Sequence, residues 1–191
     1  GKNGGLALRA YGTGGSDDVG TISTGSNGTV DVGTFNLPKG YWYQVGTSLP
    51  SFEALDFRTN RYNASFVRAQ GGDGSVADPY QLFDVYGLQG ITGLDTLGNQ
   101  PSGNNGRSYQ LVADIDATGT SGWNGGAGFA PVFLAGSLDG GGHTIDGLYV
   151  YKPPNDNAGL IGTWDNQLES GSAVSVEIKD LSLTNAHVVA A

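Results

Sequence analysis

Glycine is the feature that most limits what this chain can fold into. The 191 residues include 34 glycines. This is well above the usual share of about 7%, and no Gly-X-Y period is present, so a collagen helix is excluded. Charged residues make up only 14% of the chain, and Val, Thr, Tyr and Ile occur in short segments interrupted by Gly, Asn, Asp and Ser. Long helices need runs of helix-forming residues, so we expect an all-β chain of short strands and turns.

Two segments far apart in the chain share one layout of apolar and polar residues. The first is GTVDVGTFNL at 28–37, and the second is GSAVSVEIKDLSLTNAHV at 171–188. Repetition of one design predicts a diverged structural repeat. Short strands with many turns fit both a β-sandwich and a right-handed parallel β-solenoid. The solenoid is favoured because Asn27-Gly28 is the one convincing hairpin-type dipeptide between strand segments.

The expected fold is therefore all-β, a right-handed parallel β-solenoid with projecting loops. At the usual repeat length of roughly 20 to 29 residues, the chain would form about seven or eight coils. The segments at 94–108 and 152–157 are expected to be the projecting loops, the first because it is polar and rich in glycine and asparagine. The alternative sandwich requires antiparallel sheets, so strand direction distinguishes the two folds.

Acidic residues outnumber basic residues by 18 to 9, which gives a formal net charge of −9. Such a surface repels phosphate groups and anionic lipids, so we expect no nucleic acid partner. The chain lacks an apolar run of about 18 residues, so we expect no membrane insertion. It also has no cysteine, which excludes disulfides, thiolate metal ligands and a cysteine nucleophile. This composition is common among exported bacterial proteins, so we expect a secreted or bacterial cell-surface location.

Five motifs occur in one order between residues 71 and 188. They are GGDGSVADPYQLFDVYGL (71–88), YQLVADIDATGTSGWNGGAGFAPV (109–132), GSLDGGGHTIDGLYV (136–150), AGLIGTW (158–164) and VEIKDLSLTNAHV (176–188). The series resembles the GLUG-motif module of bacterial filamentous-haemagglutinin-like adhesins. The motif itself corresponds to Gly159-Leu160-Ile161-Gly162, where the family usually has phenylalanine in third place.

The resemblance implies one continuous, pectin-lyase-like β-helix within a longer protein. Residues 1–65 would form its N-terminal coils with an aromatic insert, and residues 66–191 would form the GLUG-like module. The resemblance also implies export by two-partner secretion, with an outer-membrane transporter as a partner during export. Glycans or proteins of host or bacterial cell surfaces would be the further partners. No catalytic residue comes with this family.

The stretch Asp139-Gly140-Gly141-Gly142-His143 is either a reaction centre or a tight turn. A catalytic base needs an orienting partner within hydrogen-bond reach, and Asp146 is the nearest candidate. In a turn, Asp139 would accept hydrogen bonds from backbone N–H groups while the glycines adopt positive φ. We interpret the stretch as a structural turn, because His187 is the only other histidine and a histidine metal site would be incomplete.

Two pairs of acidic residues raise the question of a metal or a glycosidase centre. Asp114 and Asp116 lie two residues apart, so a strand would place both carboxylates on one face. Asp73 and Asp78 lie in a glycine-rich segment whose oxygen atoms could bind Ca²⁺, but the EF-hand spacing is missing. A solvated strand face and turn capping are favoured, so we expect no cofactor and leave Ca²⁺ as an open possibility.

The aromatic residues suggest a contact patch. Tyr41, Trp42 and Tyr43 cannot all point inward from an extended strand, so at least one ring is expected at the surface. An exposed ring can stack on a sugar or pack against a partner. Two further aromatic residues, Trp123 and Phe129, are expected in the core.

These observations favour a non-enzymatic structural and adhesive segment that acts as a stiff spacer of an exported bacterial surface protein. One alternative is a carbohydrate-active enzyme, either a polysaccharide lyase or a hydrolase. A lyase needs basic residues to neutralise an acidic polymer, and only Arg58, Arg61, Arg68 and Arg107 lie near the middle of the chain. A second alternative is a self-assembling filament subunit, because strand edges left unpaired can pair with another chain.

Overall fold

A computed structural model describes residues 5–7, 29–60, 64–93, 106–153, 158–164 and 176–190. Strands predominate in these ranges. Those of the first half are β1 (Gly5–Ala7), β2 (Thr29–Leu37), β3 (Gly40–Val45), β4 (Ser51–Thr59) and β5 (Ala64–Ala69). Those of the second half are β6 (Tyr80–Leu82), β7 (Ser108–Leu111), β8 (Ile115–Asp116), β9 (Val132–Leu134), β10 (Ser137–Asp139), β11 (Thr144–Asp146), β12 (Tyr149–Lys152), β13 (Ile161–Trp164), β14 (Glu177–Lys179), β15 (Ser182–Thr184) and β16 (His187–Ala190). Helical segments are α1 (Val85–Gln89) and the 3₁₀ segments η1 (Gly90–Gly93) and η2 (Thr118–Gly126).

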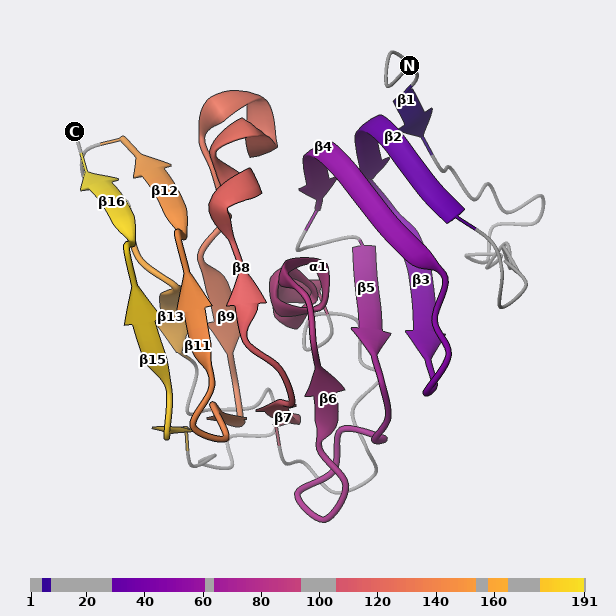
Figure 1. The fold of residues 1–191 in the computed structure, drawn as a ribbon, viewed down its shortest axis with the longest axis vertical. Helices are drawn as coiled ribbons and strands as arrows, with labels where there is room; N and C mark the ends of the chain where they lie inside the picture. Colours follow the sequence, from indigo (N-terminus) through magenta and orange to yellow (C-terminus); the bar gives the residue numbers. More distant parts are fainter. Residues whose placement is uncertain are drawn as a thin grey trace.

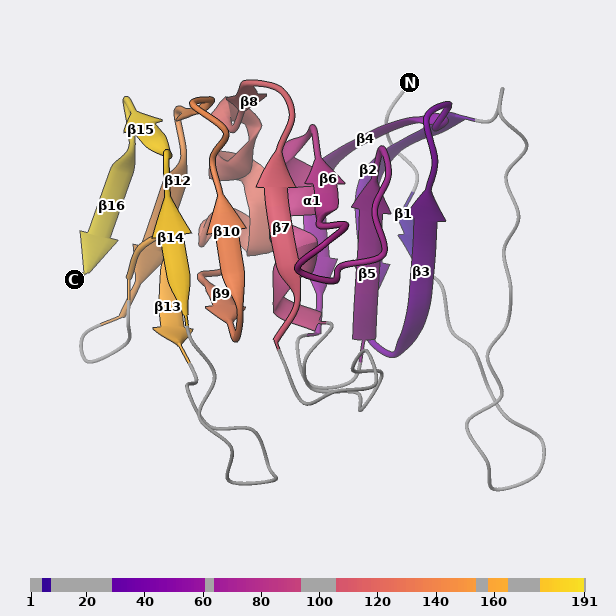
Figure 2. The ribbon, with the colours of Figure 1, turned by 90° about the horizontal axis from the view of Figure 1, so that it is seen from below.

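The strands pair in parallel within several small sheets. The sheet orders are β1-β2-β4, β3-β5, β6-β7-β10-β14, β8-β11-β15, β9-β13 and β12-β16. Figure 2 shows β6, β7, β10 and β14 side by side, with β15 and β16 at one end of the molecule. Every ladder among the described strands is parallel, and the one antiparallel contact is an isolated bridge between Gly128 and Val150. The antiparallel sandwich is therefore excluded for this part of the chain.

The expectation of one continuous right-handed solenoid of seven or eight coils is wrong. The strands form separate sheets of two to four strands, and the sheets of β1 to β5 share no strand with those of β6 to β16. Helical segments α1 and η1 lie between β6 and β7, and η2 lies between β8 and β9, so strands and turns alone do not build this part of the chain (Figure 1). Local alternation indicates strands, but it cannot specify which strands pair or whether one sheet continues into the next.

The loop prediction falls partly outside the described residues. Residues 94–105 and 154–157 are not described, so those parts of the predicted loops lie beyond the structure. Ser108, which was placed in the first loop, is instead the first residue of β7. Lys152, which was placed in the second, is the last residue of β12. The strands at both positions belong to parallel pairs, with β10 and β16 respectively.

Aromatic rings fill the interior of the first half. Phe35 and Phe57 come from neighbouring strands β2 and β4, are 0% exposed and stack with ring centroids 5.2 Å apart. Trp42 and Phe66 stack in the same way between β3 and β5, at 6.1 Å. Full burial of one such ring contributes about 1.5–3 kcal/mol. The alternating burial along β2 and β4 follows the two-residue period of a strand with one face in the core.

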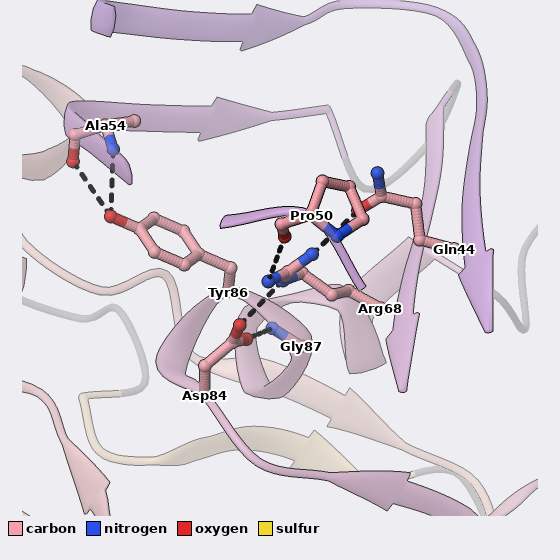
Figure 3. A network of polar contacts seen from close by, with 7 residues as sticks. All are labelled: Gln44, Pro50, Ala54, Arg68, Asp84, Tyr86 and Gly87. Atoms are coloured by element: carbon pink, nitrogen blue, oxygen red, sulfur yellow. Dashed lines mark hydrogen bonds and ion pairs between the residues drawn. The ribbon is translucent and has the colours of Figure 1, made fainter. Parts of the chain in front are cut away.

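A buried arginine links this aromatic core to α1. Arg68 is 4% exposed, and its Nε lies 2.6 Å from a carboxylate oxygen of Asp84 (Figure 3). Its other nitrogens donate to Gln44 Oε1 at 2.8 Å and to the carbonyl of Pro50 at 2.9 Å. The second carboxylate oxygen of Asp84 accepts from the backbone N–H of Gly87 at 2.8 Å and caps α1. The guanidinium is thus compensated on all sides, as a buried charge requires.

Candidate functional site

A groove of about 700 Å³ separates the two halves of the described chain. Its walls come from the first residues of β2 and β4, the turn from β6 into α1, and the segment from Asp114 to Gly119. Tyr86 fixes one wall, because its hydroxyl accepts from the backbone N–H of Ala54 at 2.9 Å (Figure 3). Since Ala54 belongs to β4 and Tyr86 to α1, this contact and the Arg68–Asp84 pair set the spacing of the groove.

The groove is acidic. The carboxylates that line it are those of Asp31, Glu53, Asp84, Asp114 and Asp116. None of the described lining residues is a lysine or an arginine. Asp31 and Glu53 lie directly opposite each other on β2 and β4. Two like charges in this position repel each other and destabilise the strand pair unless other contacts compensate. The groove therefore suits ligands that donate hydrogen bonds or carry positive charge, and it repels anions.

Asp114 and Asp116 are held by their own surroundings. The backbone N–H of Thr144 donates to Asp114 at 3.0 Å, and His143 Nδ1 lies 3.2 Å from the same oxygen. These contacts lower the pKa of Asp114, the Thr144 N–H most of all. The hydroxyl of Thr118 donates to Asp116 at 2.6 Å and lowers the pKa of that carboxyl, assisted by the Thr118 N–H. Both groups are therefore ionised at neutral pH, and neither is a proton donor there.

The glycine-rich stretch forms a turn between β10 and β11. The N–H of Gly141 donates to Asp139 Oδ1 at 2.8 Å, and this bond is the main cause of the lowered pKa of Asp139. Gly141 and Gly142 have φ of 58° and 79°, whereas Gly140 does not have positive φ. A Cβ on Gly140 would lie 2.3 Å from the carbonyl oxygen of Asp180, so close approach of the backbone requires glycine here.

His143 does not use the partner considered for it in the sequence. Its ring faces Asp114, which lies 29 residues earlier. Asp146 instead accepts hydrogen bonds from Thr184 and Asn185, each at 2.6 Å. The register of β8 and β11 explains the contact between His143 and Asp114. Asp116 lies opposite Asp146, so the segment before Asp116 runs beside the segment that begins at His143. Sequence reasoning missed this contact, since the signal is a strand register and not a motif.

The proposed aromatic patch loses one member. Trp42 is 5% exposed and packs edge-on against Phe35, so it belongs to the core and not to a contact surface. Tyr43, the next residue of β3, is 63% exposed. The side chain of Tyr41 lies outside the described structure. The alternation of a strand thus places the ring of Tyr43 at the surface, and its role in binding stays a prediction. Burial confirms the core placement of Trp123 and Phe129.

Asp73 and Asp78 stabilise their own loop. Asp73 Oδ1 accepts from the N–H of Ser75 at 2.8 Å, which is the main cause of the lowered pKa of Asp73. The carbonyl of Asp78 accepts from the N–H groups of Asp73 and Gly74, both at 3.0 Å. Within the described ranges, no three His, Asp or Glu side chains are grouped to hold a metal ion. Calcium binding stays an untested possibility.

A search of known proteins finds one informative similarity. The chain is 31% identical over 197 aligned residues to halomucin of Haloquadratum walsbyi, and the alignment covers 88% of this chain. The chain spans only 2% of the length of halomucin. Halomucin is an archaeal surface protein, so the similarity supports a secreted or surface-associated protein. No helix in the described residues is long and apolar enough to cross a membrane.

Two other comparisons give no match. No family model matches the sequence, and no solved structure matches the fold. The resemblance to the GLUG-type module of haemagglutinin-like adhesins therefore stays a prediction from the motifs.

Proposed function

We propose that this chain is a non-enzymatic structural and adhesive segment of a large exported surface protein. It would serve as a spacer and would contact glycans of other surfaces through the acidic groove. Similarity to halomucin supports the surface location. The volume of the groove, about 700 Å³, is within the range of roughly 300–1,000 Å³ that is typical of ligand sites.

The observation that carries the proposal is the acidic lining of the groove, to which Asp114 and Asp116 contribute carboxylates. Hydrogen bonds lower the pKa of both carboxyls, so each is an acceptor for a sugar hydroxyl. A glycosidase needs a carboxylic acid whose pKa is raised, and these two residues do not provide one. An acidic polysaccharide would be repelled by the groove. Neutral glycans are therefore the favoured ligand class.

Binding to a panel of neutral and acidic polysaccharides tests this function. We expect the chain to bind neutral members. Asp116→Asn keeps an oxygen acceptor for Thr118 but removes the negative charge. The affinity for neutral glycans should fall roughly fivefold in this variant. The reason is that a hydrogen bond to a charged acceptor is stronger by about 1 kcal/mol than one to a neutral acceptor. Asp78→Asn is the matched control, because Asp78 is exposed and does not line the groove. Equal losses in the two variants would contradict binding in the groove.

The same panel tests the enzymatic alternative. Reaction products are measured as new reducing ends, or as unsaturated sugars in the case of a lyase. We expect none. Turnover that is abolished by Asp114→Asn or Asp116→Asn would replace the adhesive function with a carbohydrate-active enzyme.

Tyr43 is the second contact that we propose. Its ring is 63% exposed on β3 and is available to stack on a sugar. Tyr43→Ala should weaken glycan binding, whereas Tyr151→Ala should not. Tyr151 is a suitable control because it is also an exposed tyrosine of a strand, at 42%. If neither change affects binding, Tyr43 is not a contact residue.

A further inference from the structure

The groove lies where two sheets end in the middle of the molecule. Among the described strands, β4 is the last of the order β1-β2-β4, and β8 is the last of the order β15-β11-β8. Residues of both strands line the groove. Figure 1 shows α1, and no strand, on the side of β8 that faces away from β11. Two strand edges therefore border the groove.

The edge of β4 is closed by a side chain. The N–H of Ala54 donates to the hydroxyl of Tyr86 at 2.9 Å, and this hydroxyl donates to the carbonyl of Ala54 at 3.3 Å. One hydroxyl thus takes the place that the backbone of a neighbouring strand would take. A further strand in the groove therefore has to pair with the edge of β8.

The edge of β8 presents backbone groups to the groove. The N–H of Ala117, which follows β8, donates to the carbonyl of Asp146 in β11 at 2.8 Å. Successive N–H groups of an extended chain point to opposite sides, so the N–H and C=O of Asp116 point away from β11. No described strand pairs with Asp116 on that side. Such an edge can pair with a strand of another chain.

Two carboxylates lie beside this edge at the repeat distance of a strand. Asp114 and Asp116 are exposed, whereas Ile115 between them is 1% exposed. In an extended chain, residues two positions apart share one face and are separated by about 6.6 Å. The hydrogen bonds to these carboxylates all reach Oδ1, so within the described ranges each Oδ2 accepts none. Each Oδ2 is therefore available to a positively charged group.

An extended peptide matches this arrangement in spacing and in charge. Its side chains alternate with the same repeat, so basic residues two positions apart come opposite Asp114 and Asp116. The residue between them points inward, toward the apolar lining residues Phe52 and Val85, which are 8% and 9% exposed. No lysine or arginine is among the described lining residues to repel the basic side chains. The pattern basic–apolar–basic therefore fits the edge.

We propose that the groove binds an extended segment of a partner protein with the pattern basic–apolar–basic, which adds to the edge of β8 as a further strand. Its basic side chains pair with Asp114 and Asp116, and its backbone pairs with that of Asp116. No two of the nine basic residues of this chain lie two positions apart, so the segment is not among these 191 residues.

This proposal goes beyond the proposed glycan binding, although both ligands use the same groove. The two kinds of binding are measured separately. A chain that binds the peptide but no glycan would refute the proposed function and leave this inference intact. A chain that binds glycans but not the peptide would refute this inference and leave the proposed function intact.

Two peptides of one composition test the spacing. The first is acetyl-Thr-Lys-Val-Lys-Val-Thr-amide. The second is the isomer acetyl-Thr-Lys-Lys-Val-Val-Thr-amide, whose lysines point to opposite faces of a strand. Fluorescence anisotropy of the labelled peptides measures their dissociation constants. We expect the first peptide to bind roughly fivefold more tightly, because only this peptide places both lysines opposite carboxylates. Equal affinities, or no binding of either peptide, would overturn the proposal.

Removal of two charges tests the position of the peptide. In the double variant Asp114→Asn with Asp116→Asn, the amide oxygens can still accept from Thr144 and Thr118. This variant should bind both peptides equally and more weakly than the wild-type chain. Asp78→Asn is the matched control and should keep the preference, because Asp78 is exposed and does not line the groove. Circular dichroism checks that each variant is folded. A preference that survives in the double variant would place the contact elsewhere and overturn the proposal.

Methylation of the peptide backbone tests the strand pairing. N-methyl groups on alternate residues of the first peptide remove the N–H donors of one edge and keep the lysines and their spacing. Two such peptides, one for each edge, should differ. The peptide whose methylated edge faces β8 should bind roughly fivefold more weakly than the other, because it loses backbone hydrogen bonds. Equal affinities of the two methylated peptides would show that no edge of the peptide pairs with β8, and would overturn the proposal.

Discussion

The two halves of the described chain fill their interiors in different ways. In β1 to β5, two nine-residue strands pair along nearly their whole length, and large rings such as Phe35, Phe57 and Phe66 pack between the sheets. In β6 to β16, strands of two to four residues each contribute one or two inward residues, and these align in register from strand to strand. Contacts between a few large aromatic rings stabilise the first half. The second half is stabilised by many contacts between smaller groups of residues, and these contacts depend on the register of the strands.

This difference predicts two kinds of sensitivity. The aromatic half should be most sensitive to the loss of a ring, because one ring contacts several others. The second half should be most sensitive to the backbone at its turns, because a shifted turn moves every residue of the following strand out of register.

The largest effect is expected from Phe57→Ala. Phe57 is 0% exposed and contacts Phe35, Phe66 and Trp123. Its removal leaves a cavity, so the free energy of unfolding should fall by about 3–5 kcal/mol, measured by denaturant titration. Leu55→Ala on the same strand is the control, since Leu55 is 52% exposed and should change stability by less than about 0.5 kcal/mol. Similar losses in both variants would mean that the rings do not dominate this half.

An intermediate effect is expected from Gly140→Ala. The added Cβ would lie 2.3 Å from the carbonyl oxygen of Asp180, which is backbone and cannot move without disturbing β14 and β15. We expect a loss of about 1–3 kcal/mol in the free energy of unfolding. Gly119→Ala is the control, because no atom lies within 4 Å of its added Cβ. If Gly140→Ala is as stable as the control, the backbone of this turn can move to accommodate a Cβ, and the register does not require glycine there.

The smallest effect is expected from Asp139→Ala, and it should depend on pH. Loss of the bond to the Gly141 N–H should cost on the order of 1 kcal/mol at pH 7, by analogy with helix caps. The pKa of Asp139 is lower in the folded chain than its ordinary value of 3.8. The carboxylate therefore stabilises the fold above about pH 4, and this contribution is lost as the pH falls through the folded pKa. Thermal unfolding of the wild-type chain and of Asp139→Ala between pH 7 and pH 2.5 measures their difference in stability at each pH. A difference that persists unchanged at the lowest pH would show that the charge of Asp139 is not its cause.

The local pattern of residues was sufficient for several features. The segment at 28–37 was expected to form β structure, and Phe35 and Leu37 of β2 are indeed buried there. Glycines near Asp139 indicated a turn, and Trp123 and Phe129 were correctly expected in the core. These features depend on neighbours within a few residues, because side chains of a strand alternate between two faces and only glycine adopts positive φ without strain.

Tertiary structure alone decided how these pieces combine. The division into separate sheets, the contact of His143 with Asp114 and the burial of Arg68 against Asp84 all join residues that are distant in the sequence. So does the acidic groove, whose walls come from four segments. A strand of three residues carries too little information to select its partner, and many pairings satisfy the same alternation. The partner is selected by long-range packing, which minimises the free energy of the whole chain and leaves no signal in any one segment.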